Sequence, residues 1–149
     1  MEIDLNKRHQ TMVVLWFALL MSIGSFFVFT RLAAPTISNA PRETRNPAVI
    51  VALVVFGILL VGISFLLKRK FLQKSVEKQD IGLVQQGMVL ACAICEFSAL
   101  LGVVDHFLIG DPEYYLLLVI GATGTVLHFP RREQLSAASP KIPISRASS

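Results

Sequence analysis

Charged residues are scarce in this chain of 149 residues: only 16% are Asp, Glu, Lys or Arg, while 54% are apolar. A soluble domain carries about 25% charged and about 45–50% apolar residues. The shortage of charge is concentrated in four long apolar runs, which is typical of a membrane protein and leaves no room for a soluble catalytic domain. We therefore expect an all-α, integral membrane four-helix bundle that is not an enzyme and needs no cofactor or metal.

Cysteine is also rare, and both thiols, Cys92 and Cys95, lie within the third apolar run. Two cysteines on one helix do not make a disulfide framework, and a Cys-x-x-Cys redox pair is expected only beside a soluble βαβ unit. We interpret them as small apolar side chains. The sequence has no Arg-rich stretch with interleaved aromatic residues, so nucleic acid is not an expected partner.

The apolar runs predict membrane spans over residues 11–30, 48–67, 83–104 and 113–129, which together form a membrane domain at 11–130. Residues 1–10 form a polar N-terminus, and the Ser-, Ala- and Pro-rich tail 131–149 is expected to be disordered. The first run is too long for the core of a signal peptide, so we expect it to stay uncleaved. Residue types that begin helices occur before three of the spans, at Asn46-Pro47, Asp80 and Asp111-Pro112.

Lysine and arginine are distributed unevenly between the loops. Two precede the first span, five follow the second and four follow the fourth, whereas only Arg31, Arg42 and Arg45 follow the first. The positive-inside rule then places both termini and the second connector in the cytoplasm, in the plasma membrane or a bacterial inner membrane. The cations expected at the lipid headgroups are Lys68, Arg69, Lys70, Lys74, Lys78, Arg131 and Arg132. A sharper alternative is that the lysine stripe of the connector docks a soluble partner.

Glu96 is the one acidic residue inside an apolar run, and no Lys or Arg lies in any run. An ionised acid at mid-bilayer costs at least about 2.5–3.5 kcal/mol. Keeping a glutamate protonated at pH 7 costs a similar amount, roughly 3.7 kcal/mol. We therefore expect Glu96 to be buried and uncharged, or to exchange a proton. Small and polar residues share its helical face, which predicts that this face meets another helix. The hydroxyl groups expected to support it are those of Ser22, Ser25, Thr123 and Thr125.

The stretch Gly87–Val104 sets Glu96 among small residues and continues into Leu101-Gly102 and further aliphatic residues. In this it resembles the carboxylate helix of rotary-ATPase proteolipid (c) subunits. The resemblance implies that Glu96 is a carboxylate that carries a proton or a sodium ion. The family places its acid on the second helix of a hairpin, whereas Glu96 lies on the third of four predicted spans.

Three functional hypotheses follow from the sequence. The first is a structural or accessory subunit whose partners are membrane lipids and either another membrane protein or further copies of the chain. The second is proton- or cation-coupled transport through Glu96. The third is an enzyme or metal site built from Cys92, Cys95 and Glu96 with His106 or His128. The third is disfavoured because the two histidines are expected near opposite membrane surfaces.

Overall fold

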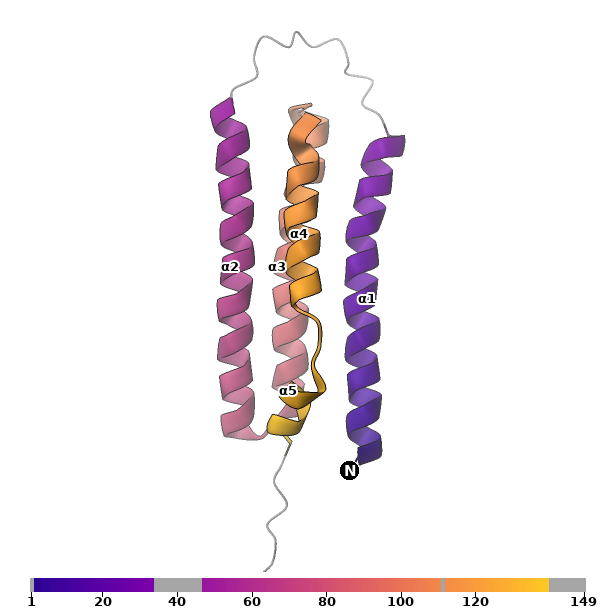
Figure 1. Cartoon of the computed structure of the whole chain (residues 1–149), viewed down its shortest axis with the longest axis vertical. Helices are drawn as coiled ribbons and strands as arrows, with labels where there is room; N and C mark the ends of the chain where they lie inside the picture. The colour runs from indigo at the N-terminus through magenta and orange to yellow at the C-terminus, as the bar shows by residue number, and fades with distance from the viewer. Residues whose placement is uncertain (1, 34–46, 111, 140–149) are drawn as a thin grey trace, which may run out of the picture.

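The computed structural model describes residues 2–33, 47–110 and 112–139. Its elements are α1 (Glu2–Leu32), α2 (Pro47–Lys78), α3 (Ile81–Leu108), the 3₁₀ turn η2 (Pro112–Tyr114), α4 (Tyr115–Leu127) and α5 (Arg132–Ala137). The first four helices run alternately up and down, with α4 in front of α3 and with α1 and α2 on either side (Figure 1). The predicted all-α helical bundle is confirmed, and the described part of the chain contains no strand.

Helices α1, α2 and α3 are long and apolar enough to cross a membrane. Their lengths of 31, 32 and 28 residues correspond to about 42–48 Å at 1.5 Å per residue. The hydrocarbon core of a bilayer is roughly 30 Å thick. Helices α1 and α2 also extend well beyond the predicted spans 11–30 and 48–67. The polar flanks 2–10 and 68–78 contain neither Pro nor Gly, so nothing in the backbone ends the helix there.

The turn between α2 and α3 is very short. Gln79 adopts a left-handed conformation with φ of 50°, and the Asp80 carboxylate accepts a hydrogen bond of 2.8 Å from the amide of Gly82. The predicted cap at Asp80 is therefore confirmed. Helix α2 begins at Pro47 as expected, while Asn46 and Asp111 lie outside the described residues. The short turn leads α3 back along α2 in the antiparallel direction (Figure 1).

Helix α4 is shorter than the span predicted over 113–129. It holds 13 residues, which cover about 20 Å, and it ends part-way down the bundle (Figure 1). Its first turn is the 3₁₀ turn η2, so Pro112 begins a helical segment as predicted. The chain leaves the helix at His128, because Pro130 lacks the amide that would continue the hydrogen bonding. Helix length alone thus supports three membrane crossings, with α4 as a shorter fourth helix.

The tail predicted to be disordered over 131–149 is ordered in its first part. Helix α5 (Arg132–Ala137) packs across the end of the bundle. Its Leu135 is 2% exposed and lies in a cluster with Met12, Val84 and Met88. Composition predicted disorder because the tail is rich in Ser and Ala. The single leucine provides enough apolar contact to hold the segment against α1 and α3. Residues 140–149 lie outside the described part.

Helix α3 lies at the centre of the bundle, where it contacts α1, α2, α4 and α5. Its closest approach to α4 is at Gly121. A Cβ atom added there would lie 2.6 Å from the Cys95 carbonyl oxygen and 2.9 Å from the Ala99 Cβ. On the α2 side, a Cβ at Gly57 would lie 2.8 Å from the Ser98 hydroxyl. Small residues therefore set the spacing of the three helices.

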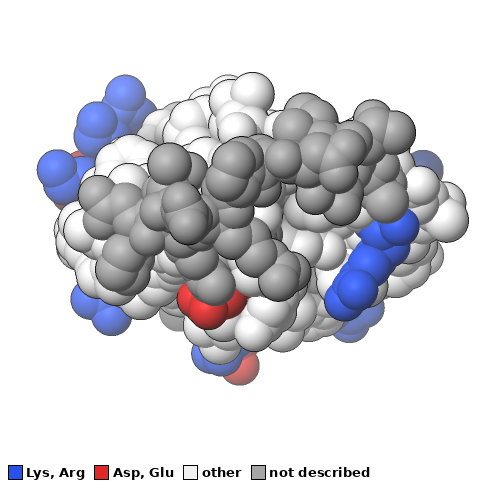
Figure 2. Space-filling view, turned by 90° about the horizontal axis from the view of Figure 1, so that it is seen from above, with Lys and Arg blue, Asp and Glu red and all other residues white. Residues whose placement is uncertain are grey.

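Basic residues gather at the end of the bundle where α1 begins and α2 and α4 end. Lys7 and Arg8 lie in the first turns of α1, the lysine-rich extension 68–78 completes α2, and Arg131 and Arg132 precede α5. Viewed from the opposite end, the described surface is mostly uncharged, and blue Lys and Arg atoms show only around its rim (Figure 2). The fold therefore brings the separate basic segments of the sequence to one end.

Candidate functional site

Glu96 lies near the middle of α3, on the edge of its contact with α1. Its buried neighbours Cys92 and Ala99 belong to clusters that include residues of α1. On its other side Ala93, Phe97 and Leu100 are exposed. Glu96 itself is only partly buried. We name its face of α3 the outer stripe, which consists of Gln85, Val89, Ala93, Glu96 and Leu100.

The prediction that a neighbouring helix covers this face is wrong for its outer half. The buried side of α3 is set by the close approaches of α2 and α4, and the clusters that include residues of α1 take in Cys92, Ala99 and the partly buried Val89. Every member of the outer stripe is partly or fully exposed. An open depression lies along the first half of this face, lined by Gly82, Gln85, Gln86, Val89, Leu90 and Ala93. The helical periodicity of the sequence correctly predicted small residues on the face of Glu96. It could not show which sides of α3 the other helices cover.

None of the four predicted hydroxyl partners bonds Glu96 among the described residues. The Ser25 hydroxyl is exposed and donates to the Met21 carbonyl on its own helix at 3.0 Å. The Thr125 hydroxyl is buried and donates to the Gly121 carbonyl at 3.0 Å. Ser22 is partly buried and Thr123 is exposed. Within the described part of the chain, the Glu96 carboxyl has no hydrogen bond or ion pair.

A second polar site lies inside the bundle, where α4 ends. Its residues, which we call the His128 cluster, are Trp16, Ser64, Lys68, Cys95, Thr125 and His128. The Ser64 hydroxyl lies 2.7 Å from His128 Nε2 and donates to the Val61 carbonyl at 2.6 Å. A hydroxyl has one proton, so Ser64 accepts from Nε2–H of His128 when it donates to Val61. His128 Nδ1 is then an unprotonated nitrogen, buried without a partner in the described structure.

The His128 cluster also closes the C-terminal end of α4. Lys68 Nζ donates to the His128 carbonyl at 3.2 Å, and Trp16 Nε1 donates to the Thr125 carbonyl at 2.7 Å. The last carbonyls of a helix lack partners within the helix and carry partial negative charge. A cation from α2 and an indole from α1 satisfy them here.

Comparison of the chain with protein-family models, with curated proteins and with solved structures finds no match. The resemblance of Gly87–Val104 to proteolipid subunits stays a prediction.

The groups considered for an enzyme or metal site come together only in part: Cys95 Sγ and His128 Nε2 both lie within hydrogen-bonding distance of the Ser64 hydroxyl, at 3.5 and 2.7 Å. Cys92 and Cys95 are free, buried thiols. His128 pairs with Ser64, while His106 stacks on Tyr114 with ring centroids 4.2 Å apart near the end of α3. Among the described residues, no group of three or more His, Cys, Asp or Glu side chains is placed to hold a metal ion. Within this part of the chain, the arrangement offers hydrogen bonding but no metal-binding cluster.

The predicted headgroup cations divide into two kinds. Arg69, Lys70, Lys74, Lys78, Arg131 and Arg132 are exposed at the basic end. Lys68 is only 9% exposed and belongs to the His128 cluster. The sequence analysis did not predict that Lys68 binds the end of α4, because Lys68 begins a run of three cations and nothing in that run distinguishes it from Arg69 and Lys70. The available signal was the position of Lys68 four residues after Ser64, on the same face of α2.

Proposed function

We propose that the protein is a multi-pass membrane subunit that binds a helix of a partner membrane protein along the outer stripe of α3. The observation that carries this proposal is the position of Glu96. Its carboxyl lies near the middle of an apolar helix, on a surface that faces lipid when the bundle is in a bilayer. Within the described chain it has no hydrogen-bond partner.

A carboxyl facing lipid is unfavourable even when it is neutral, because lipid tails offer no hydrogen bonds. An unpaired buried polar group costs about 1–3 kcal/mol by the measure of protein mutations. A partner helix that presents a hydroxyl, an amide or a backbone carbonyl removes this cost. Ala93, one turn before Glu96, is small enough to let such a helix approach closely. Gln85 on the same stripe adds a second hydrogen-bonding group.

The basic end of the bundle supports an orientation with both ends of the chain in the cytoplasm. Lys7 and Arg8 near the start of α1 lie at the same end as the cations of the α2 extension and of the segment before α5, whereas Arg31 lies at the other end of α1. The positive-inside rule assigns such an end to the cytoplasmic face. The partner then crosses the same membrane beside α3.

Photo-crosslinking in native membranes tests the partner directly. A benzophenone side chain is placed at Ala93 or Leu100 on the outer stripe, and at Val55 on α2 as a control that is 49% exposed. We expect a discrete protein adduct from the stripe positions and none from position 55. An adduct of twice the mass of the chain identifies a second copy as the partner. Adducts to lipid alone at all three positions reject the proposal.

Proton or cation transport through Glu96 is the second candidate function. The partial exposure of the Glu96 side chain on α3 favours it as well. A carboxyl that is not fixed by hydrogen bonds is free to exchange its proton, and it is accessible to reagents dissolved in the membrane. The test is proton or sodium flux in vesicles, together with labelling of Glu96 by dicyclohexylcarbodiimide. Absence of both under every gradient rejects transport.

A further inference from the structure

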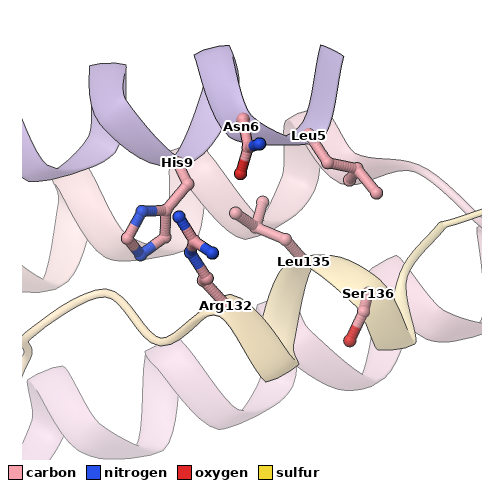
Figure 3. Close-up of a pocket in the computed structure, with 6 residues that line it drawn as sticks. All are labelled: Leu5, Asn6, His9, Arg132, Leu135 and Ser136. Carbon is pink, nitrogen blue, oxygen red and sulfur yellow. The ribbon is translucent and has the colours of Figure 1, made fainter. Parts of the chain in front are cut away.

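A pocket of about 260 Å³ lies at the basic end of the bundle, between the first turns of α1 and helix α5. It is lined by Leu5, Asn6, His9, Arg132, Leu135 and Ser136. Figure 3 shows the imidazole of His9 and the guanidinium of Arg132 together at one end of the pocket, and the Asn6 amide directed toward Leu135. The pocket thus combines a polar end with a leucine floor.

The polar end of this pocket is cationic. Arg132 is exposed and makes no hydrogen bond or ion pair with the described residues, and none of the lining residues is acidic. The Ser136 hydroxyl already donates to the Glu133 carbonyl at 3.0 Å. The remaining donors are the Arg132 guanidinium, the His9 ring and the Asn6 amide. A guanidinium presents two parallel N–H groups, a geometry that matches two oxygens of a phosphate.

Aromatic side chains lie near the pocket in both chain segments that line it. Trp16 lies two helical turns after His9, about 10 Å further along α1. Its ring meets Phe129 edge to face with centroids 5.1 Å apart. Phe129 is 46% exposed and lies three residues before Arg132. A molecule with a phosphate at one end and a hydrocarbon chain at the other matches a cationic pocket with aromatic side chains beside it.

We propose that this pocket binds an anionic phospholipid, with its phosphate on Arg132 and His9 and one acyl chain along Trp16 and Phe129. The inference rests on the membrane location in the proposed function, but not on the partner of the outer stripe. The other cations at this end raise the local concentration of anionic lipid, because basic residues are attracted to anionic headgroups.

The experiment measures lipid binding to the full chain in a neutral detergent by native mass spectrometry. The probes are phosphatidylglycerol, phosphatidylcholine and inorganic phosphate. The variants are Arg132→Gln, His9→Gln and, as a matched control, Lys78→Gln, which removes an exposed cation at the same end of the bundle. We expect the wild type to prefer phosphatidylglycerol. We expect Arg132→Gln to weaken this binding about fivefold, the size of one lost cation contact with an anionic lipid, and Lys78→Gln to leave it unchanged because Lys78 does not line the pocket.

Three results overturn the inference. They are equal affinity for the two lipids, an equal loss in Arg132→Gln and Lys78→Gln, and binding of inorganic phosphate at the same affinity as the lipid. If Arg132→Gln does not fold, Arg132→Lys replaces it. This variant keeps the charge but loses the paired donors, so an intermediate affinity supports the inference and an unchanged one contradicts it. Resistance of the wild type to carbonate extraction tests the membrane location separately, so a failure there is distinguishable from a failure of lipid selectivity.

Discussion

A buried imidazole is stable only when a partner takes its N–H, and Ser64 provides that partner for His128 at 2.7 Å. Glu96 has no comparable neighbour among the described residues and remains partly exposed on α3. The two residues therefore have different roles. His128 lies at the end of α4 inside the bundle, whereas Glu96 places a carboxyl at the outer surface of α3.

Replacing Ser64 with alanine tests the role of the hydrogen bond between Ser64 and His128. The substitution leaves His128 buried with an unpaired N–H, and we expect a loss of about 1–3 kcal/mol of stability. Unfolding of the detergent-solubilised protein by heat or by sodium dodecyl sulfate measures it. Ser25→Ala is the control, because that hydroxyl is exposed and bonds only its own helix. Equal losses in the two variants contradict a specific role for Ser64.

Substitutions at Glu96 distinguish hydrogen bonding from ion transport. We expect Glu96→Gln to keep both the stability of the bundle and the crosslink to the partner, because the amide has nearly the shape of the carboxyl and can still form hydrogen bonds. We expect Glu96→Leu to keep the stability and lose the crosslink. A crosslink that persists in Glu96→Leu contradicts this interpretation. So does a Glu96→Gln variant that no longer folds. Loss of an ion flux in Glu96→Gln points to transport instead.

Gly121 allows the close contact of α3 with α4. Gly121→Ala places a Cβ 2.6 Å from the Cys95 carbonyl oxygen, and overpacking of this kind costs about 1–3 kcal/mol. Gly24 is the matched control, because a Cβ there meets no atom within 4 Å. Alanine at position 24 is expected to be neutral or slightly stabilising, since alanine favours helix more than glycine does. Thermal unfolding of the two variants side by side gives the comparison.

At the scale of elements, the shortness of α4 shapes the lower part of the bundle. The helix ends within the protein, and side chains of α1 and α2 satisfy its carbonyls. The space beyond its end is occupied by residues 128–131 and by α5. Because α5 has only six residues, it depends on packing rather than on its own helical stability.

Leu135→Ala should therefore release α5. Removing a buried leucine costs about 2–5 kcal/mol in a well-packed core, and a short helix has little other contact to retain it. We expect rapid cleavage of the tail by a soluble protease while α1 to α4 stay folded. Leu127→Ala serves as control, because Leu127 is 61% exposed. A tail that is equally resistant in Leu135→Ala and in the wild type disproves the anchoring role.

At the scale of the whole molecule, the alternation of helices places the described basic segments at one end. Orientation in the membrane is testable with Lys78→Cys at this end and Ile109→Cys at the other, both at exposed positions. We expect a membrane-impermeant maleimide added outside intact cells to label position 109 but not position 78. The native Cys92 and Cys95 are buried and should remain unlabelled. Labelling of position 78 from outside contradicts the proposed orientation.

Local patterns in the sequence predicted the elements well. Long apolar runs identified α1, α2 and α3, Asp80 identified the start of α3, and Pro112 identified the first turn before α4. Helices α1 and α2 continue beyond the predicted spans and α4 is shorter than the fourth, while the limits of the membrane spans stay predictions. Hydropathy marks where a chain is apolar, but a helix continues until its backbone is interrupted.

The sequence by itself determined that the chain is helical and apolar and that its basic residues cluster in short segments, because composition and periodicity act on each segment separately. The tertiary structure decided which residues meet. It turned Lys68 and Trp16 toward the end of α4, joined Ser64 to His128, and left Glu96 on the outer surface of α3. Those outcomes depend on how far apart the helices lie and how each is rotated. Small residues such as Gly57 and Gly121 set these distances only when the helices are packed together.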